Sequence, residues 1–346
     1  MSRTSRAVLR FLDRTNASQA IGRSSWRQRR LLILCYHGIA LHDEHEWSPS
    51  LYMDAELFAH RLQLIAEADC NVLPLGVAIR LLSEGALPPR AVTITFDDGM
   101  YDFLAGALPH LERYGYPATV YQTTFYSTFQ RPLFEIGLSY VLWRARARPF
   151  PAWPEVGLTH PFSLTDEAER DHLLALLVQH ARSNGLSAQE EDELLCRTAA
   201  RLDESYDRLR EKRILHLMTP EELVTARDAG IAFELHTHRH RTPLDEGLFR
   251  AEVRENREWL SDHLGVTGVH FCYPSGMYHE RFLPWLADEN VRSATTCVPG
   301  LASRGQNTLL LPRFVDTSSV SDEVFVAWLH GAGHLVRRVG GRPVVP

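Results

Sequence analysis

The sequence predicts an α/β protein whose core is a distorted parallel (β/α) barrel of about seven strands with a helical insertion. Short apolar stretches rich in β-branched residues alternate with amphipathic helical patterns, which is typical of parallel βα units. The alternation stops for about ninety residues and then resumes, and the intervening stretch shows helical patterns without a convincing strand. A chain of 346 residues is long enough for one large domain with such an insertion.

Composition and pattern divide the chain into four parts. Residues 1–30 hold eight arginines against one acidic residue, which predicts a basic arm that is either disordered or an amphipathic helix on anionic lipid. Residues 31–320 carry the barrel pattern, interrupted by the helical insertion 125–218. Residues 321–346 are expected to form a C-terminal helix and tail.

Individual elements follow from periodicity, caps and turn residues. Strands are predicted at 31–36, 71–75, 91–96, 118–123, 231–235, 269–273, 291–297 and 309–314. Helices are predicted at 54–68, 77–85, 103–114, 219–230, 244–264, 280–288 and 322–336, and in the insertion at 133–147, 166–183 and 187–209. Capping boxes pair Ser187 with Glu190 and Thr219 with Glu222 at two of the helix starts.

The overall composition excludes several classes of protein. A net charge of -6 argues against a general nucleic-acid binder. The five cysteines are scattered without a CxxC pair, which indicates reduced thiols and no zinc knuckle. No apolar run is long enough to span a membrane, and the N-terminus lacks the apolar core of a secretory signal. We expect a cytoplasmic protein, with peripheral contact at the inner face of the membrane through residues 1–30 as the alternative.

Polar residues that suit metal chemistry follow three predicted strands. The strand 91–96 runs into Asp97, Asp98 and Gly99, and the strand 31–36 runs into His37. The strand 231–235 is followed by the run 236–240, His-Thr-His-Arg-His, whose first and last histidines share a face if the turn is helical. A carboxylate and two imidazoles at converging strand ends predict a metal site with open positions. The charged loop 42–46 also contains possible ligands, but such runs are usually solvated.

These motifs resemble those of the NodB-type polysaccharide deacetylases, also called carbohydrate esterase family 4. The family's first motif, TFDDG, matches residues 95–99, and its second, H-(S/T)-x-x-H, matches residues 236–240. Residues 273–276, Tyr-Pro-Ser-Gly, look like its third motif, an aromatic- and proline-rich loop on one wall of the substrate groove. The resemblance covers about 31–123 and 218–314.

The resemblance implies a role for each matching residue. The residues expected to hold one divalent metal ion, with Zn²⁺ as the expected ion, are Asp98, His236 and His240. Asp97 is expected to be the catalytic base, which takes a proton from a water that the ion acidifies. The expected substrate-binding residues are Tyr273, Pro274, Ser275 and Gly276, with a backbone N–H of the loop 274–276 for the oxyanion.

Two departures from the family pattern change the expected residue roles. Many members carry an arginine in the third motif where this chain has Cys272, so Arg313 is expected to orient Asp97 instead. The late Leu-x-His motif that supplies the general acid has no clear match, since His330 and His334 lie on the last predicted helix. We therefore expect His37 to be the acid, against the alternative that it only binds the neighbouring loop; His270 and His334 would then be reconsidered.

The function predicted from these residues is a metal-dependent hydrolase that removes N-acetyl groups. Its partner would be an amino-sugar polysaccharide, oligosaccharide or lipid-linked precursor. The alternative is a catalytically impaired, carbohydrate-binding relic of the same fold, which Cys272 and the missing late histidine favour and an intact Asp97 opposes. A metallo-phosphoesterase is disfavoured because the further carboxylates of a two-metal site are missing.

Overall fold

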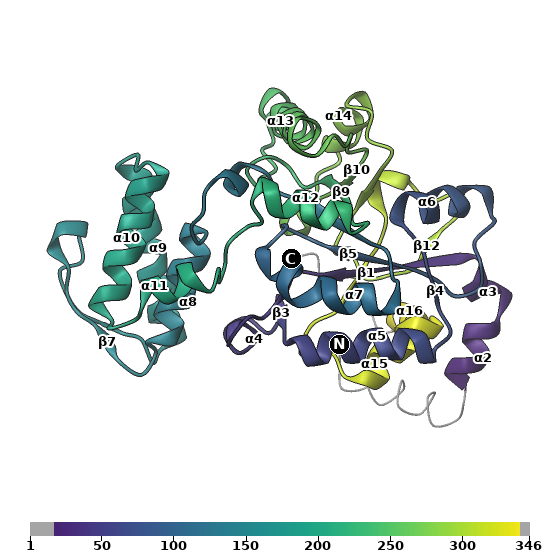
Figure 1. Ribbon diagram of the computed structural model, residues 1–346, viewed down its shortest axis with the longest axis horizontal. Coiled ribbons are helices and arrows are strands. Elements are labelled where there is room, and N and C mark those ends of the chain that lie inside the picture. The colour runs from purple at the N-terminus through teal and green to yellow at the C-terminus, as the bar shows by residue number, and fades with distance from the viewer. Residues whose placement is uncertain (1–16, 340–346) are drawn as a thin grey trace.

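The computed structural model describes residues 17–339, and Figure 1 shows their arrangement. Residues 1–16 of the expected basic arm lie outside this range. Within it, a central sheet is surrounded by helices, and a separate group of helices projects from one side. None of the described helices combines the length with the apolar character that crossing a bilayer requires.

The central sheet is curled and mostly parallel. Six strands lie in the spatial order β11–β10–β9–β6–β5–β1, and every neighbouring pair is parallel. Their bounds are β1 Arg30–Tyr36, β5 Ala91–Phe96, β6 Ala118–Gln122, β9 Ala232–Leu235, β10 His270–Cys272 and β11 Ser293–Thr295. Strand β13 (Phe314–Val315) adds to the free edge of β1, and Thr295 of β11 bridges to Leu311 just before β13. The sheet thus curls almost closed, which confirms the predicted distorted barrel.

The end of the barrel differs from the prediction. The expected strand 309–314 is a 3₁₀ turn at Thr308–Leu310, and β13 begins only at Phe314. Pro312 accounts for the break because it has no N–H to donate to a neighbouring strand. A short strand β12 (Ala302–Ser303), which was not predicted, pairs antiparallel with the start of β1 and makes the sheet mixed. Strand β4 (Asn71–Val72) pairs with β5.

The helices around the sheet follow the predicted pattern closely. They are α5 Ala55–Glu67, α6 Leu75–Glu84, α7 Leu108–Tyr114, α12 Pro220–Asp228, α13 Glu246–Leu264, α14 Phe282–Asp288, α15 Asp322–His330 and α16 Ala332–Val339. A π-helical turn, Phe103–Ala107, precedes α7, and Gly331 at φ 89° divides the predicted last helix into α15 and α16. Both predicted capping boxes are present.

Residues 17–28 are docked on the barrel. They form α2 (Ala17–Arg23) and α3 (Ser25–Gln28). Arg27 is fully buried and donates hydrogen bonds to the backbone oxygens of Leu329 (2.9 Å) and Arg30 (2.8 Å). For this part of the expected arm, the disordered alternative is therefore wrong.

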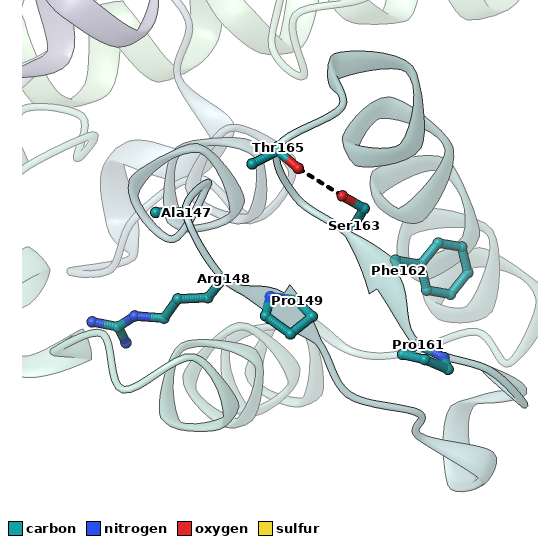
Figure 2. A pocket seen from close by; sticks show the side chains of 7 residues that line it. All are labelled: Ala147, Arg148, Pro149, Pro161, Phe162, Ser163 and Thr165. Atoms are coloured by element: carbon teal, nitrogen blue, oxygen red, sulfur yellow. Dashed lines mark hydrogen bonds between the residues drawn. The ribbon is translucent and has the colours of Figure 1, made fainter.

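The segment that follows β6 is largely helical and has its own apolar core. Its helices are α8 Phe134–Arg144, α9 Glu167–Ser183, α10 Ala188–Arg201 and α11 Tyr206–Glu211. A small antiparallel hairpin, β7 (Pro149–Phe150) with β8 (Phe162–Ser163), was not predicted. It borders the cavity of about 270 Å³ in Figure 2, where the Ser163 and Thr165 hydroxyls bond to each other at 2.7 Å. The chain returns to the barrel beside the strand-end turn, where Met218 N–H donates to Gly99 O at 3.0 Å.

A buried ion pair joins α5 to Asp316, the residue after β13, and should be important for stability. Arg61 is fully buried, and its Nε lies 3.0 Å from Asp316 Oδ2. Burial raises the pKa of Asp316 to about 7, with Arg61 opposing the shift. Arg61→Met should lower the free energy of unfolding by about 3–5 kcal/mol, because it leaves a buried carboxylate without its partner.

Urea unfolding at two pH values checks this prediction. The loss should be larger at pH 8 than at pH 5, because Asp316 is protonated at the lower pH and then needs no cation. The control is Arg80→Met, whose exposed pair with Glu84 (3.4 Å) should contribute about 0.5 kcal/mol or less. Equal losses in the two variants would contradict the prediction.

Candidate active site

The turn after β5 directs two carboxylates to different neighbours. Asp98 and Gly99 have left-handed φ angles of 70° and 81°. A Cβ atom on Gly99 would lie 1.8 Å from Oε1 of Gln122, so only glycine fits at this position. The Gln122 amide donates to the backbone oxygens of Asp98 (3.3 Å) and Thr123 (2.7 Å), which fixes the turn.

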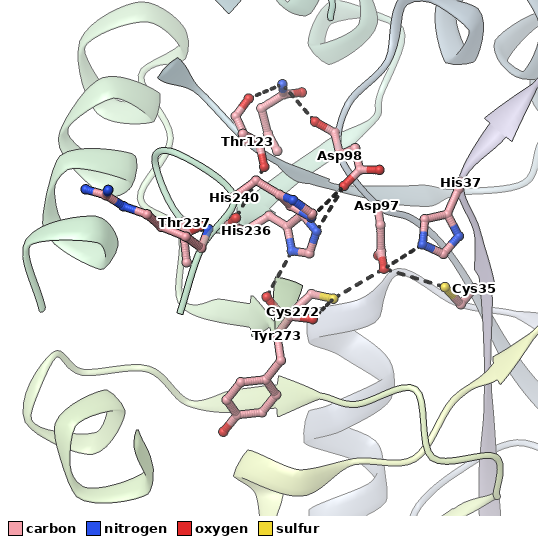
Figure 3. Close-up of polar contacts among 12 residues, drawn as sticks. Cys35, His37, Asp97, Asp98, Thr123, His236, Thr237, His240, Cys272 and Tyr273 are labelled. Carbon is pink, nitrogen blue, oxygen red and sulfur yellow. Dashed lines mark hydrogen bonds and ion pairs between the residues drawn. The ribbon is translucent and has the colours of Figure 1, made fainter. Parts of the chain in front are cut away.

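Asp98 lies with two histidines in an arrangement that fits a metal ion (Figure 3). Its Oδ1 is 3.2 Å from Nε2 of His236 and 3.2 Å from Nε2 of His240. This oxygen is buried and has no hydrogen-bond partner among the described residues, as expected of an atom placed for a cation. His236 Nδ1 donates to the backbone oxygen of Cys272 at 2.9 Å, which leaves the Nε2 lone pair free for a metal.

The histidine loop, residues 236–240, is irregular and does not form the helical turn that its spacing allowed. Thr237 and His240 adopt φ angles of 63° and 53°, and the rings of His236 and His240 still come to 5.0 Å. His238 points elsewhere, with Nδ1 2.8 Å from Thr124 Oγ1 and its ring edge-on to Phe125. It lies outside the group formed by Asp98, His236 and His240.

Two polar residues of α13 support this loop, and sequence reasoning missed both. Glu252 is buried and accepts hydrogen bonds from the Arg239 amide (2.7 Å) and from Arg241 Nε (2.6 Å). Asn256, also buried, accepts the His236 amide hydrogen at 2.9 Å. A signal was available in the sequence, because both residues interrupt the apolar face of a long helix.

The second carboxylate, Asp97, is almost fully buried against an arginine. Only 3% of it is exposed, and Arg313 binds both oxygens, with Nη1–Oδ1 at 2.6 Å and Nη2–Oδ2 at 2.7 Å. Burial would raise the pKa of Asp97, but the guanidinium more than offsets this and holds that pKa well below its usual value. The contact between Asp97 and Arg313 that the sequence predicted is present, and Asp97 is ionised at neutral pH.

His37 lies beside Asp97 at the same end of the barrel. Its Nε2 is 3.7 Å from Asp97 Oδ2, and 18% of its side chain is exposed. Figure 3 shows it across Asp97 from His236 and His240. The two alternative candidates for the general acid make other contacts. His270 Nδ1 is 2.8 Å from Ser293 Oγ, and His334 Nδ1 accepts the Leu301 amide hydrogen.

The charged loop 42–46, whose residues were possible metal ligands in the sequence, has a structural role. In the loop 42–46, Glu44 is buried and accepts the amide hydrogens of Leu41 and His42, while Asp43 binds Tyr140 and Arg144. Asp97 also lies near thiols and imidazoles that could serve as ligands. The Arg313 guanidinium disfavours a cation there, because it already occupies both Asp97 oxygens.

In the third-motif loop, residues 273–276, the structure differs from the predicted substrate contact of Tyr273. The Tyr273 ring is fully buried, and its hydroxyl donates to Leu309 O at 3.0 Å. In Figure 3 the ring points away from Asp98, His236 and His240. Its expected contact with substrate is therefore wrong, and Pro274 is buried as well. The Tyr273 and Gly276 amides bond to backbone oxygens, which leaves Ser275, exposed at φ 55°, as the loop's amide with no hydrogen bond to the described residues.

Arg313→Met should test how firmly Asp97 is held. The variant leaves Asp97 buried without its counterion, so the free energy of unfolding should fall by about 3–5 kcal/mol. Arg313→Lys keeps the charge but loses the two-point contact and should recover part of this loss. Urea denaturation measures both, and an Arg313→Met protein as stable as the parent would contradict the ionised pair.

Comparison with known proteins identifies the family that these features resemble. The sequence model of the family described as "Polysaccharide deacetylase" matches residues 178–294, a range that contains the histidine loop and the third-motif loop but not Asp97 and Asp98. No curated protein matches the chain.

Several solved structures share the fold. A Streptococcus pyogenes deacetylase, PplD, solved with acetate, is 20% identical at a TM-score of 0.57, covering 87% of this chain and 97% of its own. IcaB from Ammonifex degensii is 15% identical at a TM-score of 0.54, covering 88% and 97%. BC0361, a Bacillus cereus polysaccharide deacetylase, is 14% identical at a TM-score of 0.54, covering 87% and 69%. At identities of 14–20%, the structural similarity shows a shared fold.

Family match and fold together confirm the predicted resemblance to the NodB-type polysaccharide deacetylases. The matched family model describes polysaccharide deacetylases, and the similar solved structures carry the same fold.

Proposed function

We propose that this protein removes N-acetyl groups from an amino-sugar polysaccharide, oligosaccharide or lipid-linked precursor, with the help of one divalent metal ion. The observation that carries the proposal is the pairing of two distinct carboxylates at one strand end. Asp98 lies with His236 and His240, and the neighbouring Asp97 is ionised and clamped by Arg313.

The residues that would hold the ion are Asp98, His236 and His240. Two imidazole nitrogens and one carboxylate oxygen suit Zn²⁺ in a site that keeps positions open for water and substrate. When bound, the ion would supply a Lewis acid for the acetyl carbonyl and a lowered pKa for water.

The remaining steps belong to the chain's own groups. Asp97 would take the proton of the attacking water, and Arg313 keeps it ionised and oriented. His37 would give a proton to the leaving amine, and the Ser275 amide would donate to the carbonyl oxygen as negative charge develops there. The products are acetate and a free amino sugar.

His37→Ala tests whether His37 is the general acid, because it should lower activity without removing the metal. Losing an acid catalyst lowers kcat by about 10²–10⁴-fold, while metal content should stay unchanged because His37 lies outside the ligand group. His172→Ala, an exposed histidine of α9, is the control and should leave kcat unchanged. A normal kcat in His37→Ala would end the proposed role.

Acetate release tests the function as a whole. The metal-loaded protein should release acetate from N-acetylglucosamine oligomers or acetylated poly-glucosamine. The alternative function, a carbohydrate-binding relic, predicts that the same oligomers bind without release. The ionised Asp97 favours the enzyme, since binding alone does not need a base.

A further inference from the structure

The buried carboxylate Asp97 is surrounded by two thiols in addition to Arg313. Cys272 Sγ lies 3.4 Å from Asp97 Oδ2, and Cys35 Sγ lies 3.6 Å from the same oxygen. Both cysteines are fully buried, one on β10 and the other on β1, so they approach the carboxylate from different strands. Figure 3 shows both contacts.

We propose that the thiols of Cys272 and Cys35 donate hydrogen bonds to Asp97 Oδ2 and are positioning residues for this carboxylate. The inference rests on the proposed function, in which Asp97 is the base, and adds two residues to the groups that hold it. A thiol with an ordinary pKa of about 8.5 carries its proton at neutral pH and can act as a donor.

The geometry favours the carboxylate over the other acceptors within reach. Cys272 Sγ is 3.8 Å from the Tyr273 backbone oxygen, and Cys35 Sγ is 3.9 Å from that of Tyr36. Each alternative is longer than the contact with Asp97, and a backbone carbonyl carries no net charge. Hydrogen bonds to an ionised acceptor are the stronger ones, so each S–H should point at Oδ2.

The two thiols restrain a motion of the Asp97 carboxylate that Arg313 alone permits. The guanidinium lies in one plane and binds both carboxylate oxygens, which fixes the distance but permits the carboxylate to tilt out of that plane. Donors from two further strands, both on Oδ2, would restrain that tilt. Cys272 also lies 3.1 Å from Arg313 Nη2, so a larger side chain there would displace the guanidinium.

Kinetics provide the first arm of the test. Cys272→Ala and Cys35→Ala should each lower kcat about tenfold with little change in KM, because each removes a thiol donor to the charged Asp97 and leaves the substrate-binding groups in place. Cys272→Ala also removes the sulfur that accepts from Arg313 Nη2. Serine keeps a donor in a side chain of similar shape, so Cys272→Ser should recover most of the rate. The control is Cys196→Ala, an exposed cysteine of α10, which should match the parent.

An infrared measurement provides an arm that needs no substrate. The S–H stretching band moves to lower frequency when the thiol donates a hydrogen bond, and the bands of the two cysteines are assigned by their loss in the alanine variants. Asp97→Asn removes the charged acceptor and should move both bands to higher frequency. The band of Cys297, which approaches Arg313 Nη2 (3.6 Å) rather than Asp97, serves as the internal reference.

The outcomes distinguish this inference from the proposed function. Bands that do not respond to Asp97→Asn, or a Cys272→Ser variant as slow as Cys272→Ala, would overturn the positioning role. A protein that releases no acetate but shows the band shifts would refute the function and leave the two hydrogen bonds to Asp97 established.

Discussion

Asp97→Asn should lower kcat for acetate release by about 10²–10⁴-fold while the protein keeps its metal, the loss typical for a general base. An amide has the shape of the carboxylate but cannot take the proton of water. The metal should remain because Asp97 is not one of the residues grouped with Asp98. Metal analysis and initial rates on the same preparation measure both quantities.

Stability needs a separate control in this experiment. Asp97→Asn also removes the counterion of the buried Arg313, so unfolding must be followed and rates compared where the variant is folded. Asp69→Asn is the matched exchange at an exposed carboxylate, 87% of whose side chain is accessible, and should match the parent. A normal rate in Asp97→Asn would mean that the base is another residue.

His240→Ala should lose the metal and, with it, activity down to background. The site offers one carboxylate and two imidazoles, and removing one of three ligands leaves too few donors to hold a divalent ion at ordinary concentrations. The loop should survive, since His240 is partly exposed and its neighbours are held by Glu252. Elemental analysis after dialysis gives the answer.

His238→Ala is the control from the same loop. This histidine bonds to Thr124 and lies outside the metal group, so the variant should keep the ion. If His240→Ala held as much metal as His238→Ala, the assignment of ligands would be wrong.

The sequence could predict those features that follow from local pattern. Strand 91–96 reads as buried from its β-branched residues, and the two carboxylates that follow must then lie at the carboxyl end of a parallel sheet. The contact of Arg313 with Asp97 was predicted from a resemblance and one missing arginine. It required no knowledge of the path that brings β13 beside β1.

The features that were missed depend on tertiary contacts. Glu252 and Asn256 support the histidine loop from a helix that follows it, and only the fold brings them together. The Tyr273 ring turns into the core to reach Leu309 O, although a tyrosine in such a loop could equally face the groove. The last strand was predicted too early because Pro312 interrupts an otherwise apolar run.

One measurement tests the central claim, that Asp98, His236 and His240 serve a deacetylation reaction, most directly. The protein is stripped of metal with a chelator, titrated with Zn²⁺, and assayed for acetate released from N-acetylglucosamine oligomers. We expect no acetate from the stripped protein and full recovery of the rate when one equivalent of Zn²⁺ has been added. Acetate release that persists without metal, or no release from any acetylated amino-sugar oligomer at full occupancy, would contradict the account.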